Sequence, residues 1–235
     1  MPLVALAASL AACTNSDEPA AAGGGVADDS TLVVTSGARV PSEEGPRVVF
    51  LGTSLTAGLG LQDDHDTYVA QLDEMADSAG KPFVAINAGV SGETSAGGLR
   101  RLDWILREPV DVLVLELGAN DGLRGQDPRA LAENLTEIVR RTRTRHGDIP
   151  IVITGMEAPP NLGQAYTGAF RGVFEEVATR ERTELVPFLL DGVAGVPELN
   201  QSDRIHPTAE GHGRMAANVW PVLEGVLDSM NAEAR

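Results

Sequence analysis

The feature that most constrains the fold of this chain is a set of short apolar runs, each ended by a residue that favours turns. Val110–Leu117, with the sequence VDVLVLEL, is the longest and stops at Gly118. A nearly continuous apolar run has no polar face, so it suits a strand buried on both sides in a parallel sheet. The shorter runs are Val48–Leu51, Phe83–Ile86, Ile149–Thr154 and Glu184–Val186.

Segments with helical periodicity alternate with these runs. They are Tyr68–Ala79, Gly98–Arg107, Pro128–Arg145, Tyr166–Arg182 and Ala209–Leu227. Strands that alternate with helices predict an α/β domain in three layers, α/β/α, with about five parallel strands. In such domains ligands bind beyond the carboxyl ends of the strands, so the residues that follow each strand are the candidates for function.

The first 46 residues differ from the rest of the chain. Leu3–Ala12 is apolar but too short to span a bilayer, which is typical of a signal peptide. With Cys13 it ends in LAAC, which resembles the lipobox of bacterial lipoproteins; the resemblance implies a signal peptide over residues 1–12 and a lipid on Cys13. Residues 13–46 are rich in Ala, Gly, Asp, Ser and Pro, as expected of a flexible tether to a folded domain over residues 47–235.

The N-terminus and the composition together limit the partners of the protein. We expect an exported lipoprotein, periplasmic or on the cell surface, that meets the membrane through a lipid anchor only; simple secretion is the alternative. The formal net charge of −16 argues against nucleic acid as a partner, because binding to phosphates needs a basic face. The single cysteine excludes an internal disulfide and a cysteine-based metal cage.

Polar residues stand directly after the predicted strands, and a further pair lies near the C-terminus. Ser54 follows the first strand in GTSLTAG, Gly89 the second in NAGVSGET, and Asn120 the third in LELGANDG. Asp203 precedes His206 by three residues, a spacing that lets the carboxylate meet one imidazole nitrogen while the other faces a pocket.

These residue types together meet the needs of acyl transfer. A serine hydroxyl is a weak nucleophile until a base accepts its proton, and the base needs a partner that fixes its tautomer. The tetrahedral intermediate needs donors around its oxyanion, which a backbone N–H and a side-chain amide could supply. Each fragment alone is common in turns and helix caps, but four of them in order at strand ends indicate a serine hydrolase.

The blocks GTSLTAG, NAGVSGET, LELGANDGLRG and DRIHPTAEG resemble the four signature blocks of the SGNH, or GDSL-type, hydrolases. The resemblance extends from Arg47 to Leu227 and is closest to the bacterial multifunctional esterases with thioesterase, arylesterase and lysophospholipase activities. It implies a flavodoxin-like sheet and a carboxylic ester hydrolase that acts on small-molecule esters or thioesters of short to medium chain through an acyl-enzyme, with neither metal nor cofactor.

The resemblance also implies a role for each residue of the candidate site. Ser54 is the expected nucleophile, His206 the expected base, and Asp203 the residue that orients it. The N–H groups of Ser54 and Gly89 and the amide of Asn120 form the expected oxyanion hole.

Two further positions qualify this expectation. Thr53 stands where the family usually has aspartate before the nucleophile. Threonine can still hydrogen-bond and cap a helix, so the departure concerns the local support of the serine more than the chemistry. The resemblance also suggests that the acyl group lies against the loop after the fourth strand, at Ala158 and Pro159; this loop opens at the same rim as Ser54.

Other interpretations remain open. A carbohydrate O-acetylesterase would use the same scaffold, and a surface lipoprotein that binds a small ligand would carry the same residues without catalysis. Ser91 is a rival nucleophile, although no Gly-x-Ser-x-Gly elbow surrounds it. His65, in the acidic sequence of residues 63–66, suggests a metal site only weakly, because one histidine among hard oxygen ligands is not a recognisable cage.

Overall fold

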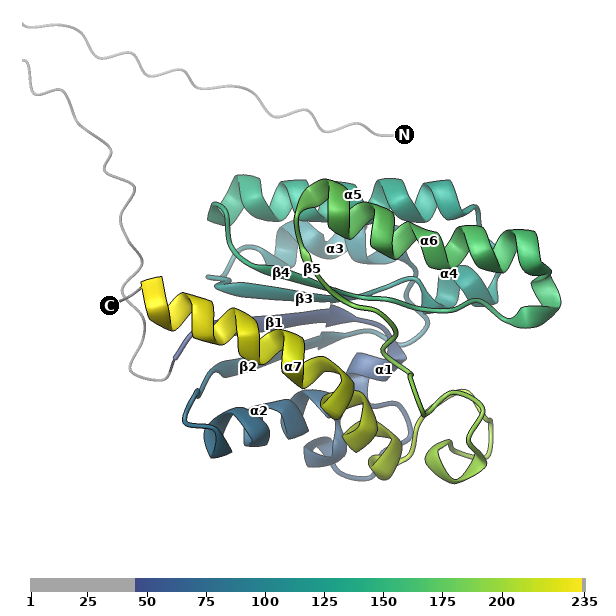
Figure 1. The fold of residues 1–235 in the computed structure, drawn as a ribbon, viewed down its shortest axis with the longest axis horizontal. Helices are drawn as coiled ribbons and strands as arrows, with labels where there is room; N and C mark the ends of the chain where they lie inside the picture. The colour runs from purple at the N-terminus through teal and green to yellow at the C-terminus, as the bar shows by residue number, and fades with distance from the viewer. Residues whose placement is uncertain (1–44, 234–235) are drawn as a thin grey trace, which may run out of the picture. The chain divides into compact units, whose positions relative to one another are not determined.

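A computed structural model describes residues 45–233, which form a five-stranded parallel sheet with helices on both faces (Figure 1). The strands are β1 (Arg47–Gly52), β2 (Val84–Gly89), β3 (Val112–Glu116), β4 (Ile151–Thr154) and β5 (Glu184–Val186). Their order is β2-β1-β3-β4-β5, the flavodoxin-like arrangement. The predicted three-layer α/β/α domain with about five parallel strands is therefore confirmed.

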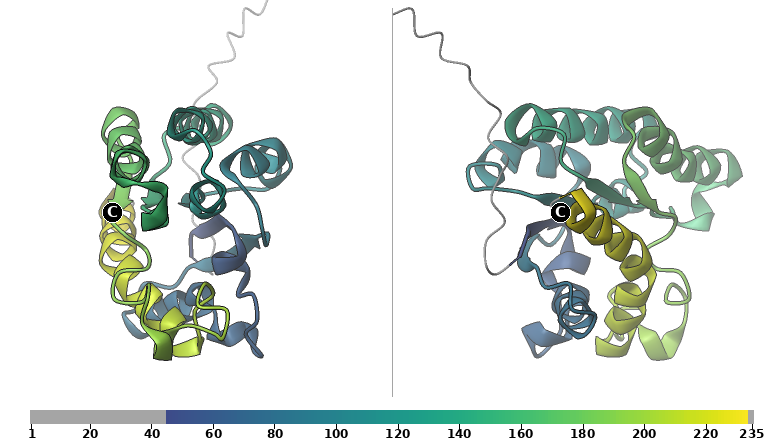
Figure 2. Two further views of the ribbon diagram at one scale, coloured as in Figure 1. Left: turned by 90° about the vertical axis from the view of Figure 1, so that its right-hand side faces the viewer. Right: turned by 60° about the vertical axis from the view of Figure 1, so that its left-hand side comes forward.

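The helices divide between the two faces of the sheet. They are α1 (Ser54–Ala57), α2 (Tyr68–Ser78), α3 (Ser95–Ile105), α4 (Ala119–Leu123), α5 (Pro128–His146), α6 (Gln164–Glu181) and α7 (Ala209–Glu233), with short 3-10 turns at 64–66, 160–162 and 197–199. In Figure 1 and Figure 2, α3, α5 and α6 cover one face, and α2 and α7 pack together on the other. All five predicted helices are present.

Two helices lie where the sequence predicted none. α1 has four residues and α4 has five, too few for a helical period to be visible. α3 also begins earlier than predicted, because the Thr94 hydroxyl accepts the Gly97 N–H at 3.3 Å and caps the helix there. These short additions directly follow β1, β2 and β3, at the edge of the sheet where function was expected.

The core lies between the inner strands and the two helical layers. Every residue of β3 and β4 is buried, as their apolar sequences predicted, whereas β2 at the edge is half-buried.

A buried histidine joins the two helices α2 and α7. The Tyr68 N–H of α2 donates to His212 Nδ1 of α7 at 3.1 Å, and the two rings stack. Burial lowers the pKa of His212 to about 4, so the imidazole remains a neutral acceptor. This contact fixes the start of α7 against α2.

The N-terminal predictions fall mostly outside the described residues. The signal peptide of residues 1–12, Cys13 and the tether as far as residue 44 all lie there. Pro46, the last residue of the predicted tether, already belongs to the fold, because its carbonyl oxygen accepts the Val84 N–H at 2.8 Å. Within residues 45–233, none of the helices combines the length and the apolar character that crossing a bilayer requires.

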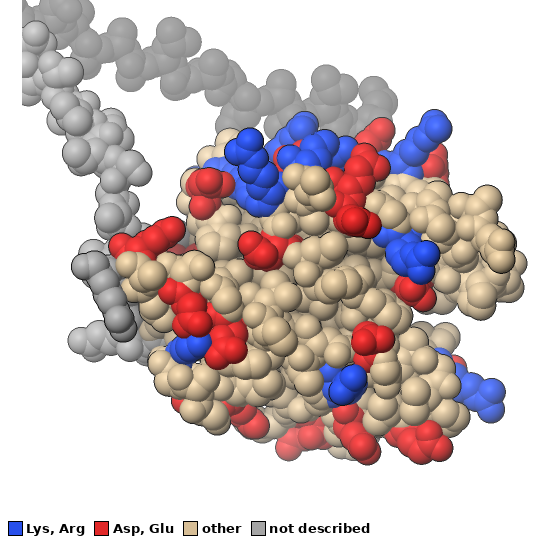
Figure 3. Space-filling model, in the orientation of Figure 1, with Lys and Arg blue, Asp and Glu red and all other residues tan. Residues whose placement is uncertain are grey.

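Acidic and basic side chains are interspersed over the face shown in Figure 3, with basic ones gathered along α5. Three arginines of this helix have acidic partners: Arg140 pairs with Glu181 at 3.1 Å, Arg141 with Glu137 at 2.7 Å and Arg143 with Asp148 at 3.1 Å. Arg143 also lies in the last turn of α5, where positive charge complements the helix dipole. These pairs favour a solvated helix end over an anion-binding patch.

Candidate active site

Ser54 lies at the turn between β1 and α1. The strand ends at Gly52, and Thr53 is the N-cap of α1, its side chain accepting the Leu55 N–H at 3.4 Å. Ser54 is therefore the first helical residue, just beyond the carboxyl end of β1, and 8% of its surface is exposed. The turn is short because Gly58 ends α1 in the left-handed conformation, with φ of 71°.

His206 and Asp203 come from one loop near the C-terminus and meet Ser54. The Ser54 hydroxyl lies 3.0 Å from His206 Nε2, and His206 Nδ1 lies 2.6 Å from Asp203 Oδ2. The other carboxylate oxygen of Asp203 accepts the N–H groups of Ile205 and His206 at 2.9 and 3.0 Å. The hydrogen bond from the His206 ring, with these two backbone bonds, holds the pKa of Asp203 well below its usual range. An ionised Asp203 keeps the proton of His206 on Nδ1 and leaves Nε2 as the acceptor for serine.

Asn120 and Asp121, at the start of α4, hold the loop that follows β2. Asn120 Nδ2 donates to the Glu93 carbonyl oxygen at 2.9 Å, and Asp121 Oδ2 accepts the Ser95 N–H at 2.9 Å. A primary amide has two N–H groups, so one fixes the rotamer of Asn120 and the other is left for a ligand. The pair therefore joins the loops after β2 and β3.

One cavity of about 650 Å³, here called the serine cavity, is lined by Ser54, His206 and Asn120. Ala158 and Pro159 also line it, so the structure places the predicted acyl-binding loop in its wall. The remaining apolar lining is Leu55, Leu59, Ala119, Leu123, Met156, Pro160, Phe188, Leu190, Ala194 and Ile205. A concave, mostly apolar site with a few convergent polar groups is typical of a small-molecule pocket.

Gly89, predicted to belong to the oxyanion hole, is not among the residues that line the serine cavity. It is the last residue of β2, and its N–H donates to Asn87 Oδ1 at 3.0 Å. A Cβ there would lie 2.2 Å from the Ala57 backbone nitrogen, so this glycine allows close packing between β2 and α1. Gly92, three residues later in the same block, lines the serine cavity instead. Its φ of +78° is one that glycine adopts without strain.

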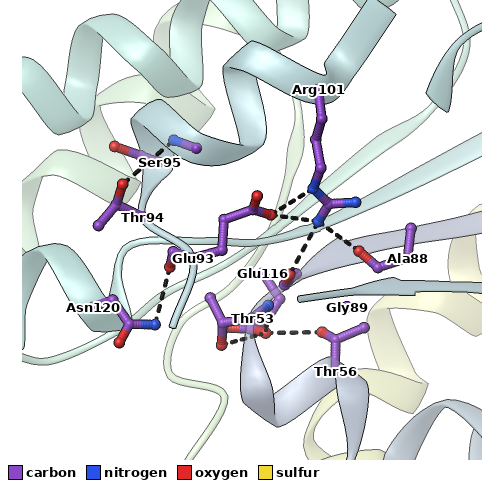
Figure 4. Close-up of polar contacts among 12 residues, drawn as sticks. Thr53, Thr56, Ala88, Gly89, Glu93, Thr94, Ser95, Arg101, Glu116 and Asn120 are labelled. Atoms are coloured by element: carbon purple, nitrogen blue, oxygen red, sulfur yellow. Dashed lines mark hydrogen bonds and ion pairs between the residues drawn. The ribbon is translucent and has the colours of Figure 1, made fainter. Parts of the chain in front are cut away.

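Glu116 is a residue of the site that the sequence reasoning missed. Its side chain is fully buried at the end of β3, next to Thr53 and Thr56 (Figure 4). The carboxylate accepts the Thr53 N–H at 2.7 Å, the Thr53 hydroxyl at 3.0 Å and the Thr56 hydroxyl at 2.8 Å. Thr53, in the place of the family aspartate, thus donates to this carboxylate from both its backbone and its side chain. The available signal was one acidic residue at the end of an otherwise apolar strand.

Burial raises the pKa of Glu116 from 4.5 to about 7, against the hydrogen bonds from Thr53 and Thr56, which lower it. Between those two pH values the folded protein holds a proton that the unfolded chain has lost. The free energy of unfolding should therefore fall by about 3 kcal/mol from Glu116 as pH rises through this window. Glu116→Gln cannot ionise and should remove that fall, whereas Glu74→Gln, at an exposed position, should not. Urea denaturation from pH 4 to 8 measures it, and a constant difference between wild type and Glu116→Gln would contradict the expectation.

The acidic sequence around His65 forms a short 3-10 turn at residues 64–66, capped by Asp63, whose Oδ1 accepts the His65 N–H at 3.0 Å. The His65 side chain is exposed. Across residues 45–233, no three His, Cys, Asp or Glu side chains are grouped so that they could hold a metal ion.

Known proteins share both the sequence and the fold of this chain. The profile of the GDSL-like Lipase/Acylhydrolase family matches residues 50–214. Esterase TesA from Pseudomonas aeruginosa is 41% identical over 181 residues, covering 77% of this chain and 89% of the relative. Thioesterase 1/protease 1/lysophospholipase L1 from Escherichia coli K12 is 34% identical over 165 residues, covering 69% of this chain and 76% of the relative.

Two solved structures resemble this chain in fold as well as in sequence. The crystal structure of TesA superposes with a TM-score of 0.73 at 41% identity, covering 77% of this chain and 99% of that one. The structure of AlinE4, an SGNH-hydrolase family esterase, gives 0.64 at 39% identity, covering 79% and 99%.

Proposed function

The chain belongs to the GDSL-like lipase/acylhydrolase family, the SGNH hydrolases, and from this we propose that it cleaves short- to medium-chain esters or thioesters with Ser54 as nucleophile. The observation that carries the proposal is the hydrogen-bonded chain from Ser54 Oγ through His206 to Asp203, at 3.0 and 2.6 Å, at the wall of an apolar cavity. That chain supplies a nucleophile, a base and an orienting carboxylate in contact with one another.

The reaction proceeds in two halves. His206 Nε2 accepts the Ser54 proton while Ser54 Oγ attacks the acyl carbon, and the tetrahedral intermediate forms. As the bond from the acyl carbon to the leaving oxygen or sulfur breaks, His206 returns the proton to the alcohol or thiol, and the acyl-enzyme remains. Water then attacks this ester through the same base, releasing the acid and restoring the Ser54 hydroxyl. Asp203 stabilises the imidazolium in both halves.

The oxyanion hole consists of the Ser54 N–H, the Gly92 N–H and the second amide hydrogen of Asn120. All three residues line the serine cavity, and the fixed Asn120 rotamer is set before substrate binds. Among residues 45–233, no acceptor takes the Gly92 N–H, so this donor is available to a developing negative charge. In this proposal Gly92, and not Gly89, supplies the backbone donor from the loop after β2.

The acyl group occupies the serine cavity against Ala158 and Pro159. The lining is mostly apolar, so it favours a hydrocarbon chain, and a volume of about 650 Å³ suits a small molecule. The relatives named above are an esterase and a thioesterase with lysophospholipase activity, which supports a choice of ester and thioester substrates.

The test is an activity series with the full-length chain. p-Nitrophenyl esters from acetate to palmitate and acyl thioesters of the same lengths should be hydrolysed, with the short and medium chains fastest. A fluorophosphonate should titrate one serine per chain, and mass mapping should place it on Ser54. A preference for acetylated xylan over every simple ester would instead identify a carbohydrate O-acetylesterase. A folded chain that neither hydrolyses nor is labelled would be a binding protein.

We also propose that the protein is exported and anchored through Cys13. The support is the lipobox-like sequence and the length of the polar segment that separates it from the catalytic domain. Two or three acyl chains on one residue make a durable anchor, which one chain does not. Mass spectrometry of the N-terminal peptide decides between a lipid on Cys13 and an unmodified N-terminus, which would reduce the proposal to secretion.

A further inference from the structure

Arg101 of α3 connects the ends of two strands and one loop at the carboxyl edge of the sheet (Figure 4). Its guanidinium donates from Nε to the Glu93 carboxylate at 2.7 Å, and a second nitrogen of the same group also bonds to Glu93. That second nitrogen donates to the Ala88 carbonyl oxygen at 2.7 Å and to the Gly52 carbonyl oxygen at 3.3 Å. Arg101 therefore holds the ends of β1 and β2 and the loop that follows β2.

Glu93 carries this connection onward to the oxyanion hole. Its carboxylate binds Arg101, its carbonyl oxygen accepts from Asn120, and it directly follows Gly92. The side chain folds back over α3 because Gly97 leaves room for it: a Cβ at Gly97 would lie 2.8 Å from the Glu93 side chain. The pair is well shielded, with 20% of the Arg101 side chain and 8% of the Glu93 side chain exposed.

The Arg101 guanidinium also holds the turn that carries the Ser54 nucleophile. The peptide that joins Gly52 to Thr53, one residue before Ser54, offers its carbonyl oxygen to Arg101 and its N–H to Glu116. This peptide is thus fixed at both its oxygen and its N–H by ionisable side chains that are buried or half-buried. Through Arg101, the backbone that places the Ser54 nucleophile and the backbone that places the oxyanion donors are fixed to one side chain.

We propose that Arg101 is a positioning residue of the hydrolase, which sets the distance between the Ser54 turn and the oxyanion donors Gly92 and Asn120. The inference rests on the proposed function of Ser54. Arg101 itself lines a separate cavity of about 520 Å³ behind β1 and β2, so it acts through Glu93 and Gly52 and not on the substrate. Its planar fork serves several acceptors at once, which the single ammonium of lysine cannot do in the same geometry.

The primary test compares Arg101→Gln and Arg101→Lys with Arg100→Gln, an exposed arginine one position earlier on α3. Rates are measured with the full-length chain on p-nitrophenyl butyrate and expressed per Ser54 titrated by fluorophosphonate, so that misfolded protein is not counted. Arg101→Gln should lower kcat about 10- to 100-fold with little change in KM, because displaced donors lose contact with the transition state. Arg101→Lys should lie between it and wild type, and Arg100→Gln should match wild type. Guanidinium ion added to Arg101→Gln should restore part of the lost kcat.

The decisive measurement repeats Arg101→Gln in an Asn120→Ala background. If Arg101 acts by placing the oxyanion donors, its removal should cost less than about threefold in kcat once one of those donors is gone. Glu93→Gln leaves Arg101 in place and removes its carboxylate partner. It should likewise cost less in kcat in the Asn120→Ala background than in the wild type, and it replaces Arg101→Gln in the test if that variant does not fold. An equal cost in both backgrounds, or full activity of Arg101→Gln, would overturn the inference. A wild-type chain that neither hydrolyses the ester nor reacts with fluorophosphonate would instead overturn the proposed function.

Discussion

Ser54→Ala should abolish ester hydrolysis while leaving the unfolding transition nearly unchanged. The hydroxyl bonds to His206 Nε2 at 3.0 Å, at the wall of the serine cavity, and its loss should cost the fold little. Catalysis, by contrast, depends on it completely, because no acyl-enzyme forms without the nucleophile. The expected loss in kcat is about 10⁶-fold, and His206→Ala should cost about as much, because the residues of a triad act as a unit.

The rate of p-nitrophenyl butyrate hydrolysis and the thermal unfolding transition are measured for each variant and for the wild type. Ser91→Ala is the matched control, since Ser91 is an exposed serine of the neighbouring loop and was the rival nucleophile. That variant should retain the activity of the wild type. Substantial turnover in Ser54→Ala, together with a loss in Ser91→Ala, would move the nucleophile to the second loop.

Asn120→Asp should lower kcat by about 10²–10³ at neutral pH, at least as much as Asn120→Ala. The change is nearly isosteric, but it replaces a donor by a carboxylate and sets negative charge beside the forming oxyanion. It also turns a bond into a repulsion, because the oxygen that replaces Nδ2 would face the Glu93 carbonyl oxygen at 2.9 Å. Since the interaction with the oxyanion develops in the transition state, KM should change little.

The control for this substitution is Asn161→Asp, the same chemical change at an exposed position of the loop after β4. It should leave kcat unchanged, which separates an effect of added charge from an effect at the oxyanion. If Asn120 merely shapes the turn before Gly122, aspartate would serve as well there as asparagine. Nearly full activity of Asn120→Asp would then remove Asn120 from the oxyanion hole.

The parts of the site that could be predicted are those encoded locally. Asp203 and His206 are three residues apart, and the turn between them brings their side chains together without help from the rest of the fold. Ser54 follows an apolar run that could hardly be anything but a buried strand. The absence of Gly89 from the serine-cavity lining has a physical cause in the strand boundary. β2 was expected to end at Ile86, but pairing with β1 continues to Gly89, so the first residue free to leave the sheet comes later in the block.

The residues that the sequence did not indicate act through long-range contacts. Glu116 meets Thr53 across 63 positions, and Arg101 meets the Gly52 carbonyl across 49. Neither spacing follows a helical or strand period, so no local sequence pattern indicates that Glu116 and Arg101 belong to the site. They became visible only when the order of the strands placed the ends of β1, β2 and β3 side by side.

The contact between Ser54 and His206 spans 152 positions, nearly the whole folded part of the chain. The base also precedes α7, which must pack against α2 through His212 and Tyr68 before the histidine loop has a fixed place. A polypeptide still being synthesised carries its serine early but lacks its base until residues 203–206 have been added. A chain synthesised only as far as residue 202 therefore has the nucleophile but cannot hydrolyse an ester by this mechanism.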